Sequence, residues 1–208
     1  MTLTTPSTIR TRPLHPSAHT DRPWRIHELA PDFRLEDVWA LPTPGGPDDL
    51  PRLLELMTTG DDEREFPLPY RVLFAVRWWL GGVLGLDDDE DGLDARVPSL
   101  GDRLPDDLRG TEPPEFSTEP FRSVYRTDRE FVAEIANRTV HGLMHVGWVQ
   151  DPAVPDGYRG QMAVLVKPNG VLGEAYLALI KPFRHLVVYP ALLRTIARKW
   201  QSRPGVAA

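Results

Sequence analysis

The sequence contains no cysteine. A chain without cysteine has no disulfide framework, no thiolate nucleophile and no sulfur-ligated zinc site. The amino-terminal segment also lacks the unbroken apolar stretch of a secretory signal peptide. Both absences fit a reducing compartment, and we expect a cytoplasmic protein.

Positive charge is also in short supply, because 24 Lys and Arg residues face 30 Asp and Glu residues, which leaves a net charge of −6. Nucleic-acid binding requires clustered positive charge that displaces counterions from phosphates. The most apolar run, residues 72–86, is too short to span a bilayer and contains Arg77 in its middle. We therefore expect no nucleic-acid partner and no membrane insertion.

The chain is long enough for one domain, with 208 residues of which 41% are hydrophobic. Residues 1–23 are rich in Thr, Ser and Pro and contain few large apolar groups. Such a segment cannot bury enough surface to offset its ordering entropy. The sequence therefore predicts a disordered tail over 1–23 and a folded domain over 24–203.

The first half of the domain predicts a strand followed by helices. Large apolar residues within 27–42 indicate the strand, and residues 47–57 have an acidic start and helical apolar spacing. Residues 69–84 predict a helix that is apolar over most of its circumference, which is typical of a buried helix or one covered by a partner chain. Residues 87–118 are rich in acid and proline and predict a long surface loop.

The second half predicts a sheet covered by a long helix. Strands are expected at 121–126, 130–136, 139–149 and 160–167. The helix that follows should be kinked or interrupted by Pro182 and Pro190. Its apolar residues at helical intervals are Leu172, Tyr176, Leu179, Phe183 and Leu186.

Two histidines four residues apart, His141 and His145, raise the question of a metal site. On a helix this spacing permits shared ligation, whereas on a strand it separates the residues by about 13 Å. Val140, Val146 and Trp148 favour a strand, and the Glu of the H-E-x-x-H metalloprotease motif is absent. We therefore expect no metal at these histidines.

The register of the predicted hairpin gives the histidines other partners. A two-residue turn at 137–138 places Glu134 opposite His141 and Glu130 opposite His145. One face of the hairpin is then polar and the other almost wholly apolar. We interpret the polar face as the outer, solvated side of the sheet, with a histidine–carboxylate acid/base pair as the alternative.

The apolar face is the candidate ligand site. Small residues at 123, 133 and 142 form a row that leaves space under a covering helix, unless helix side chains or a close backbone approach fill it. The expected lining comprises Ser123, Tyr125, Phe131, Ala133, Gly142, Met144 and Trp148 from the strands and Tyr176 from the helix.

Three segments carry a resemblance to a known family: "DVWALPTPGG", "NRTVHGLMHVGWV" and "LVKPNGVLGEAYLALIKPFRHLVVYPALL". With the order of elements, they resemble a branch of the START-like (SRPBCC) superfamily known only as a domain of unknown function. The resemblance covers most of residues 26–200. It implies an α+β helix-grip fold, an antiparallel sheet wrapped around a long kinked C-terminal helix. It also implies a cavity for lipids, hormones or polyketides, and in some members cyclase activity.

Other motifs do not support a metal or a cofactor. "DDDEDG" at 87–92 reproduces the opening of an EF-hand calcium loop, but Pro98 stands where a bidentate Glu is required. "GGVLG" at 81–85 lacks the Lys-Ser/Thr of a phosphate-binding loop, and no nucleophile elbow or dinucleotide fingerprint is present. We expect neither a metal nor a cofactor.

Three functional hypotheses remain open. The first is a protein that binds a small, largely apolar molecule, lipid- or polyketide-like, between the sheet and the C-terminal helix. The second is an enzyme of the polyketide cyclase or dehydratase kind that uses the same cavity. The third is an interaction module whose helix 69–84 packs on a partner or on its own copy as a homodimer. Binding is the leading hypothesis because an enzyme needs a positioned acid or base, and the predicted inner face of the sheet offers only Ser123 and Tyr125.

Overall fold

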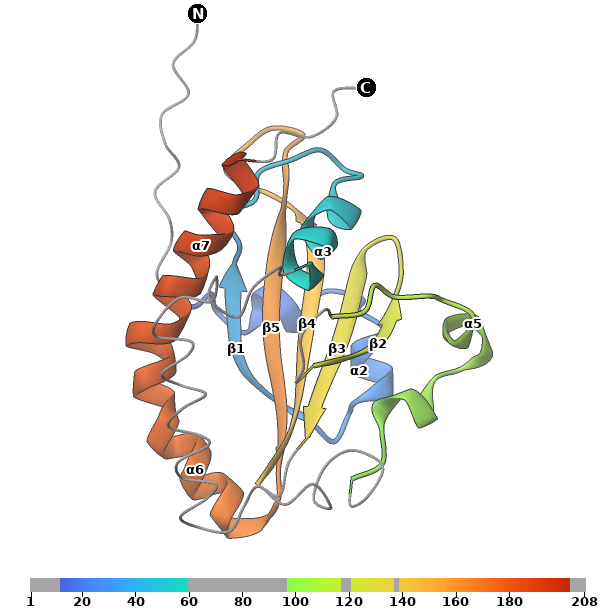
Figure 1. Ribbon diagram of the computed structural model, residues 1–208, viewed down its shortest axis with the longest axis vertical. Coiled ribbons are helices and arrows are strands. Elements are labelled where there is room, and N and C mark those ends of the chain that lie inside the picture. The colour runs from blue at the N-terminus through green and yellow to red at the C-terminus, as the bar shows by residue number, and fades with distance from the viewer. Residues whose placement is uncertain (1–11, 60–96, 117–120, 137–138, 203–208) are drawn as a thin grey trace, which may run out of the picture.

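The computed structural model describes residues 12–59, 97–116, 121–136 and 139–202 (Figure 1). Its centre is a five-stranded antiparallel sheet with the strand order β1-β5-β4-β3-β2. The strands are β1 (Arg34–Ala40), β2 (Arg122–Arg126), β3 (Glu130–Ala136), β4 (Val140–Gln150) and β5 (Tyr158–Pro168). The chain therefore has an α+β fold in which the sheet packs against a C-terminal helix, as the sequence predicts.

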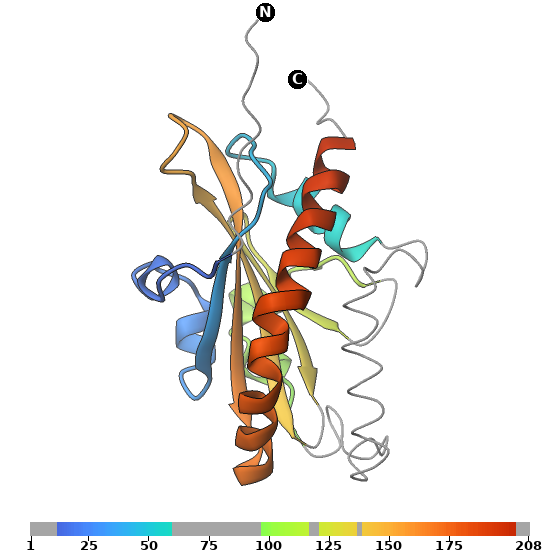
Figure 2. The ribbon, with the colours of Figure 1, turned by 90° about the vertical axis from the view of Figure 1, so that its left-hand side faces the viewer.

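Helices cover both faces of this sheet (Figure 2). The front face, defined by Trp39, Phe131, Val146 and Met162, packs against α3 (Leu50–Thr58) and the C-terminal helix. The back face carries Val38, Val132, Leu143 and Ala163. It is covered by α1 (Ser17–Thr20), α2 (Ile26–Leu29), the 3-10 turn η3 (Leu100–Arg103) and α5 (Asp106–Arg109).

The C-terminal helix has the predicted interruption. It consists of α6 (Gly170–Phe183), the π-helical turn η4 (Arg184–Val188) and α7 (Tyr189–Ser202). Pro182 lies just before the turn and Pro190 just after it. Because proline has no backbone N–H and crowds the preceding turn, the two prolines explain why the regular hydrogen-bond pattern breaks between them.

The predicted apolar stripe of this helix does not face the sheet. Leu172, Leu179 and Leu186 are 51%, 70% and 78% exposed, whereas Gly173 and Leu177 are buried. A side chain on Gly173 would collide with the Thr139 carbonyl oxygen, so a glycine allows the helix to approach the sheet there. Apolar periodicity missed this face because its closest contact involves no side chain.

The folded domain begins before residue 24. Residues 14–20, which the sequence assigns to a disordered tail, lie on the back face of the sheet. The Leu14 backbone N donates to the Val38 carbonyl oxygen at 2.7 Å, and His19 in α1 is buried. Leu14 and Ala18 also pack partly against the core, and the Gln161 side chain donates to the Ala18 carbonyl oxygen.

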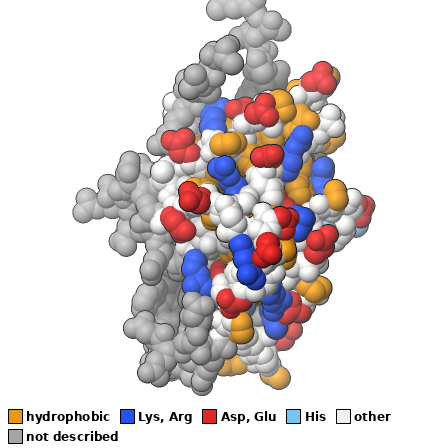
Figure 3. Space-filling view, turned by 90° about the vertical axis from the view of Figure 1, so that its right-hand side faces the viewer, with side chains coloured by type: hydrophobic (Ala, Val, Ile, Leu, Met, Phe, Trp, Pro, Cys, Tyr) orange, Lys and Arg blue, Asp and Glu red, His pale blue; other side chains and the backbone are white. Residues whose placement is uncertain are grey.

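Three predicted features lie outside the described residues, namely the apolar helix 69–84, the acidic segment 87–92 and the two-residue turn at 137–138. The described part of the predicted loop, 97–116, contains the short turns η3 and α5 rather than only irregular chain. Within the described residues, no helix combines the length and apolarity needed to cross a membrane. On the β2 side of the molecule, acidic and basic side chains are interspersed (Figure 3).

Candidate functional site

The two hairpin strands β3 and β4 pair two residues away from the predicted register. Glu134 lies opposite Leu143, Glu130 lies opposite Gly147, and His141 lies opposite Ala136. Because side chains alternate with a period of two, this offset leaves every residue on its predicted face. The prediction of two chemically distinct faces is therefore confirmed, and the predicted pairs are wrong.

The histidines are not solvated. His141 and His145 are 2% and 0% exposed, because the amino-terminal segment and η3 cover this face. They reach the expected glutamates diagonally, with 3.0 Å between His141 Nε2 and Glu134 Oε2 and 2.9 Å between His145 Nε2 and Glu130 Oε2. The prediction of an exposed face is wrong, since periodicity identifies a polar face but not what covers it.

Glu134 is the more heavily bonded of the two glutamates. Besides His141 it accepts hydrogen bonds from Ser99 Oγ at 2.5 Å and from the Leu100 backbone N at 2.9 Å. Burial alone would raise the pKa of Glu134, but these hydrogen bonds outweigh burial and lower the pKa. Glu134 is thus a stable buried carboxylate that fastens the chain before η3 to the sheet.

The predicted lining residues separate into two groups. Phe131, Ala133, Gly142, Met144 and Trp148 lie on β3 and β4 with the predicted front-face parity. On the edge strand β2 the pair Ser123–Ala133 is confirmed, and Ser123 Oγ donates to the Pro114 carbonyl oxygen at 2.6 Å. Tyr176 of α6 is half-buried.

Tyr125 is the exception, because it lies on the back face. The register of β2 shifts between Ser123 and Tyr125, so Tyr125 pairs with Val132 instead of lying beside Phe131. A bulge adds one residue to a strand and reverses the face of the residues that follow. The expected row of small residues is also broken, since Met144 and not Gly142 lies opposite Ala133.

The actual front-face row runs across the whole sheet. It passes from Asp37 in β1 through Val164, Met144 and Ala133 to Ser123 in β2, each residue paired with the next. Met144 and Val164 in the two central strands are only half-buried, although Val146 and Met162 beside them are buried. The row therefore joins a buried acid at one end to a less covered apolar centre.

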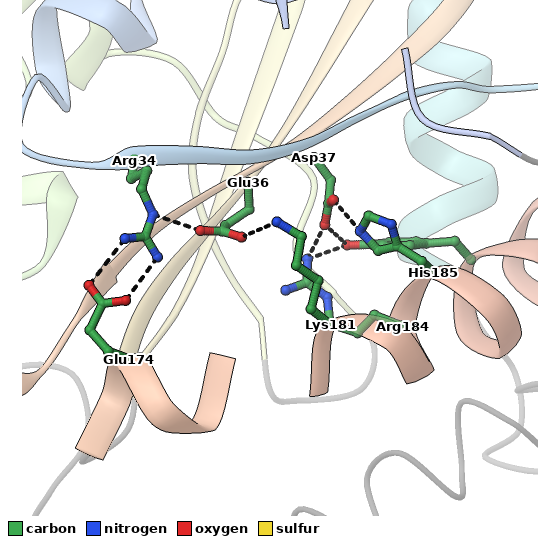
Figure 4. Close-up of polar contacts among 8 residues, drawn as sticks. Arg34, Glu36, Asp37, Glu174, Lys181, Arg184 and His185 are labelled. Carbon is green, nitrogen blue, oxygen red and sulfur yellow. Dashed lines mark hydrogen bonds and ion pairs between the residues drawn. The ribbon is translucent and has the colours of Figure 1, made fainter. Parts of the chain in front are cut away.

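Asp37 is the centre of a polar cluster between β1 and the π-helical turn (Figure 4). Its Oδ1 contacts His185 Nε2, and its Oδ2 accepts hydrogen bonds from Arg184 Nη2 and, at 3.1 Å, from the Tyr189 hydroxyl. Arg184 Nη2 also donates to the Tyr189 hydroxyl at 2.5 Å. We call Asp37, Arg184, His185 and Tyr189 the Asp37 cluster.

The Asp37 cluster lies in a poorly solvated environment. The side chains of Asp37 and Arg184 are 1% and 9% exposed, and that of His185 is 24% exposed. Burial raises the pKa of Tyr189, so its hydroxyl stays protonated and donates to Asp37. Asp37 and Arg184 neutralise each other, which leaves the cluster with polar groups but little net charge.

The π-helical turn explains how these side chains converge. Arg184 and His185 begin the turn, and Tyr189 follows it at the start of α7. The extra residue in such a turn shifts the side-chain phase, and such turns are frequent at functional sites. On the strand, the register shift between Leu35 and Asp37 directs Asp37 to the front face.

An aromatic side chain extends this polar environment. Trp39 is fully buried on the front face, with its ring centroid 4.5 Å from that of Tyr189 and 5.7 Å from that of His185. Among the described residues, its Nε1 has no hydrogen-bond partner. A buried donor of this kind can serve an acceptor group of a bound molecule.

An ion-pair ladder beside the cluster ties α6 to β1 (Figure 4). Arg34 Nη1 lies 3.1 Å from Glu174 Oε1, and Arg34 Nε lies 2.7 Å from Glu36 Oε1. Lys181 Nζ lies 3.4 Å from Glu36 Oε2. Burial would raise the pKa of Glu36, but Arg34 and Lys181 outweigh it and lower the pKa.

Sequence reasoning missed the Asp37 cluster. Two signals were present: an acid inside the apolar strand "LEDVWA", and the Arg-His-Tyr group of "RHLVVY" between two prolines. An α-helical period would not bring residues 184 and 189 to one point, whereas the π turn does.

The described residues contain no group of three or more His, Cys, Asp or Glu side chains that could hold a metal ion.

The comparisons with known proteins identify the family. No curated protein and no solved structure gives a significant match to the chain. The model of the family described as "Protein of unknown function (DUF2867)" matches residues 29–191, a span that contains the sheet, α6 and the Asp37 cluster. Because this match covers more than half of the sequence, the chain belongs to that DUF2867 family.

Proposed function

We propose that the protein binds a small, largely apolar molecule, lipid- or polyketide-like, between the front face of the sheet and the C-terminal helix. The observation that carries the proposal is the incomplete burial of Met144 and Val164 at the centre of the sheet. Ligand sites are largely apolar surfaces with a few convergent polar groups. The front-face row has this composition, with the Asp37 cluster at one end.

The position of the C-terminal helix supports the proposal of a space over Met144 and Val164. Near its start, α6 approaches the sheet directly at Gly173. Near its end, α7 packs through Leu193, Ile196 and Trp200 into the buried front-face core. Met144 and Val164 lie between these two contacts, where the side chains of the central strands have the least cover. A bound molecule would complete the burial of both side chains.

The Asp37 cluster favours an uncharged polar group on the ligand. A second anion would meet Asp37 and a second cation would meet Arg184, so an ionic ligand would disturb an existing buried pair. A carbonyl or hydroxyl oxygen can instead accept from the Trp39 indole N–H without adding charge. We therefore expect a neutral ligand with one oxygen-containing end.

We further propose that this family is a branch of the START-like (SRPBCC) superfamily. The support is the order of elements: a first strand, a short helix, an antiparallel sheet and a long interrupted C-terminal helix. The superfamily places its ligands between sheet and helix, which agrees with the proposed site. Resemblance of fold alone does not specify a ligand, so the test must come from binding.

Binding of a neutral naphthyl ketone dye to the purified full chain, with native mass spectrometry of co-purified molecules, tests the proposal. Met144→Trp should fill the centre of the row and weaken dye binding at least about tenfold, which corresponds to about 1.4 kcal/mol. Leu179→Trp, on the exposed side of α6, is the matched control and should bind the dye like the wild type. The melting temperature of both variants is measured in parallel.

Two results would contradict the binding proposal. The first is a wild-type protein that neither carries a small molecule nor binds the dye. The second is a Met144→Trp protein that melts much earlier than the control, because an already packed front face would be overpacked by the larger ring.

An acid/base enzyme is the second candidate, and the contact between Asp37 and His185 favours it. Asp37 holds His185 through Nε2, which leaves Nδ1 as the other proton-transfer position of the ring. A carboxylate that orients an imidazole is the arrangement of a general base, as a cyclase or dehydratase requires.

A comparison of co-purified molecules separates the enzyme from a simple binder. If the protein is a dehydratase, His185→Gln should retain an unreacted molecule heavier by one water than the one in the wild type. His15→Gln, a change at an exposed histidine, is the control and should match the wild type. Identical molecules in all three proteins would favour binding without catalysis.

A further inference from the structure

The amino-terminal segment, residues 14–29, packs on the back face of the sheet, where Trp24, Ile26 and Leu29 are buried in the core. The Leu14 backbone N donates to Val38, and Gln161 Nε2 donates to the Ala18 carbonyl oxygen at 3.1 Å. The Trp24 ring lies over Gly147, where a Cβ would come within 2.7 Å of it. The polar connections of the segment also include a row of histidines.

This histidine row consists of His27, His19 and His145, and it ends on Glu130. The distance from His27 Nε2 to His19 Nδ1 is 3.2 Å, and that from His19 Nε2 to His145 Nδ1 is 3.3 Å. His145 Nε2 lies 2.9 Å from Glu130 Oε2. Since the carboxylate only accepts, His145 donates through Nε2 and accepts through Nδ1, and the same assignment repeats along the row. Three neutral rings with the proton on Nε2 therefore satisfy every contact.

Additional protons are poorly accommodated in this row. His19 and His145 are 1% and 0% exposed, and their ring centroids are 4.8 Å apart. A charge on either ring would be buried, and charges on neighbouring rings would repel each other. His27 is half-buried, so it is the only member of the row with partial access to water.

We propose that the histidine row is an acid-sensitive latch that fastens residues 14–29 to the back face and releases them as the pH falls. When the segment leaves, His19 becomes solvated and His145 loses its cover, so both rings accept protons freely. The released state therefore binds more protons than the docked state, and acid favours release.

The pKa shifts of His19 and His145 determine how docking of the segment depends on pH. Burial first, and then the neighbouring His145 and His27, lower the pKa of His19 from 6.5 to about 3. Burial also lowers the pKa of His145, although Glu130 opposes this change. Because both docked values lie below the free value, docking is strongest above the free pKa. It weakens as the pH falls from there toward the docked pKa.

Other charged groups near the row modulate the latch without reversing it. Glu130 of β3 favours a protonated His145, and its Oε1 also accepts from the Arg25 backbone N at 2.9 Å. The Arg25 side chain is engaged by Glu28 of α2 at 3.5 Å and by Asp107 of α5 at 3.1 Å. Tyr125 of β2 is buried nearby, and burial raises the pKa of its hydroxyl, which stays neutral. For His145, burial outweighs the opposing effect of Glu130, so its pKa is lowered.

Hydrogen–deuterium exchange of the full chain at about pH 7.5 and about pH 5, corrected for intrinsic exchange rates, tests the latch. For each histidine that cannot be protonated while docked, the opening equilibrium should rise roughly 30-fold over this range. Residues 14–29 should therefore lose protection by about that factor or more. Strands β4 and β5 should remain protected, because the sheet itself does not open.

His19→Phe keeps a ring in place but cannot take up a proton. Its pH response should be at least about tenfold smaller than that of the wild type, since the central titrating group is gone. His15→Gln, at an exposed histidine of the same segment, should respond like the wild type. Unchanged protection of residues 14–29 in the wild type, equal losses in β4, or a full response in His19→Phe would each overturn the latch.

Ring titration by nuclear magnetic resonance on the wild type keeps the proposal testable if His19→Phe does not fold. His19 and His145 should stay neutral for as long as the segment is docked. Protonation of His19 or His145 near the ordinary histidine pKa in the docked state would also overturn the latch.

Discussion

The two faces of the sheet use buried polar residues in different ways. On the back face, two glutamate–histidine pairs are fully enclosed and connect the sheet to the segments that cover it. On the front face, one cluster around Asp37 joins the sheet to the π-helical turn, and the apolar centre beside it is half-buried. The comparison indicates that the cover of the back face encloses its polar groups, whereas Met144 and Val164 at the centre of the front face stay half-buried, where we propose the ligand site.

The largest expected effect comes from the acid of the front face. Asp37→Ala leaves Arg184 buried without its counter-charge and removes the partner of His185. Breaking a buried ion pair from one side costs about 3–5 kcal/mol, so the free energy of unfolding should fall by this amount. Urea denaturation followed by tryptophan fluorescence measures it. A loss as small as that of an exposed aspartate would mean that the Asp37 cluster is solvated.

The corresponding change on the back face is His145→Ala. It creates a cavity at a fully buried site and removes the partner of both Glu130 and His19. We expect a loss of about 2–4 kcal/mol in the free energy of unfolding. His15→Ala, at an exposed histidine, should change it by less than about 0.5 kcal/mol. Equal values for the two variants would contradict the enclosed back face.

A third change tests the close approach of α6 to the sheet. Gly173→Ala places a methyl group against the Thr139 carbonyl oxygen, so the start of the helix must move away. The expected cost is about 1–3 kcal/mol, as for other overpacked positions. Gly110→Ala is the control, because a Cβ at that glycine meets no atom within 4 Å. Thermal unfolding of the two variants gives the comparison, and a stable Gly173→Ala protein would indicate a looser contact.

The smallest effect is expected at the exposed ladder between α6 and β1. Glu174→Gln removes one partner of Arg34, and both side chains are about half exposed. Surface ion pairs of this kind contribute about 0–1 kcal/mol and are screened by salt. The difference from the wild type should therefore shrink further in high salt. A larger loss than that of Gly173→Ala would show that the ladder, rather than the glycine contact, positions α6.

Local patterns were sufficient to predict most of the fold. Alternation and turn residues gave the strands of the second half, and Pro182 and Pro190 marked the break in the C-terminal helix. The parity of β3 and β4 also placed glutamates and histidines together, even though the register was two residues off. The alternation of side chains between the two faces is a property of each strand alone. An error of two residues in the register therefore leaves every side chain on its predicted face.

The site was not predictable in the same way. A β-bulge moved Tyr125 to the back face, and a π turn brought Arg184 and Tyr189 to Asp37. Both features insert one residue into a regular period, and no regular pattern contains such an insertion. The burial of His141 likewise depends on segments distant in the sequence, which hydrophobic periodicity does not describe.

Methionine methyl resonances provide the most direct test of a ligand site on the front face. The chain contains four methionines, among them the half-buried Met144 at the centre of the row and Met57 in α3. We predict that titration with the neutral naphthyl ketone dye shifts the Met144 methyl resonance first and more strongly than that of Met57. Saturable dye binding that leaves the Met144 resonance unchanged would contradict a ligand site between the sheet and the C-terminal helix.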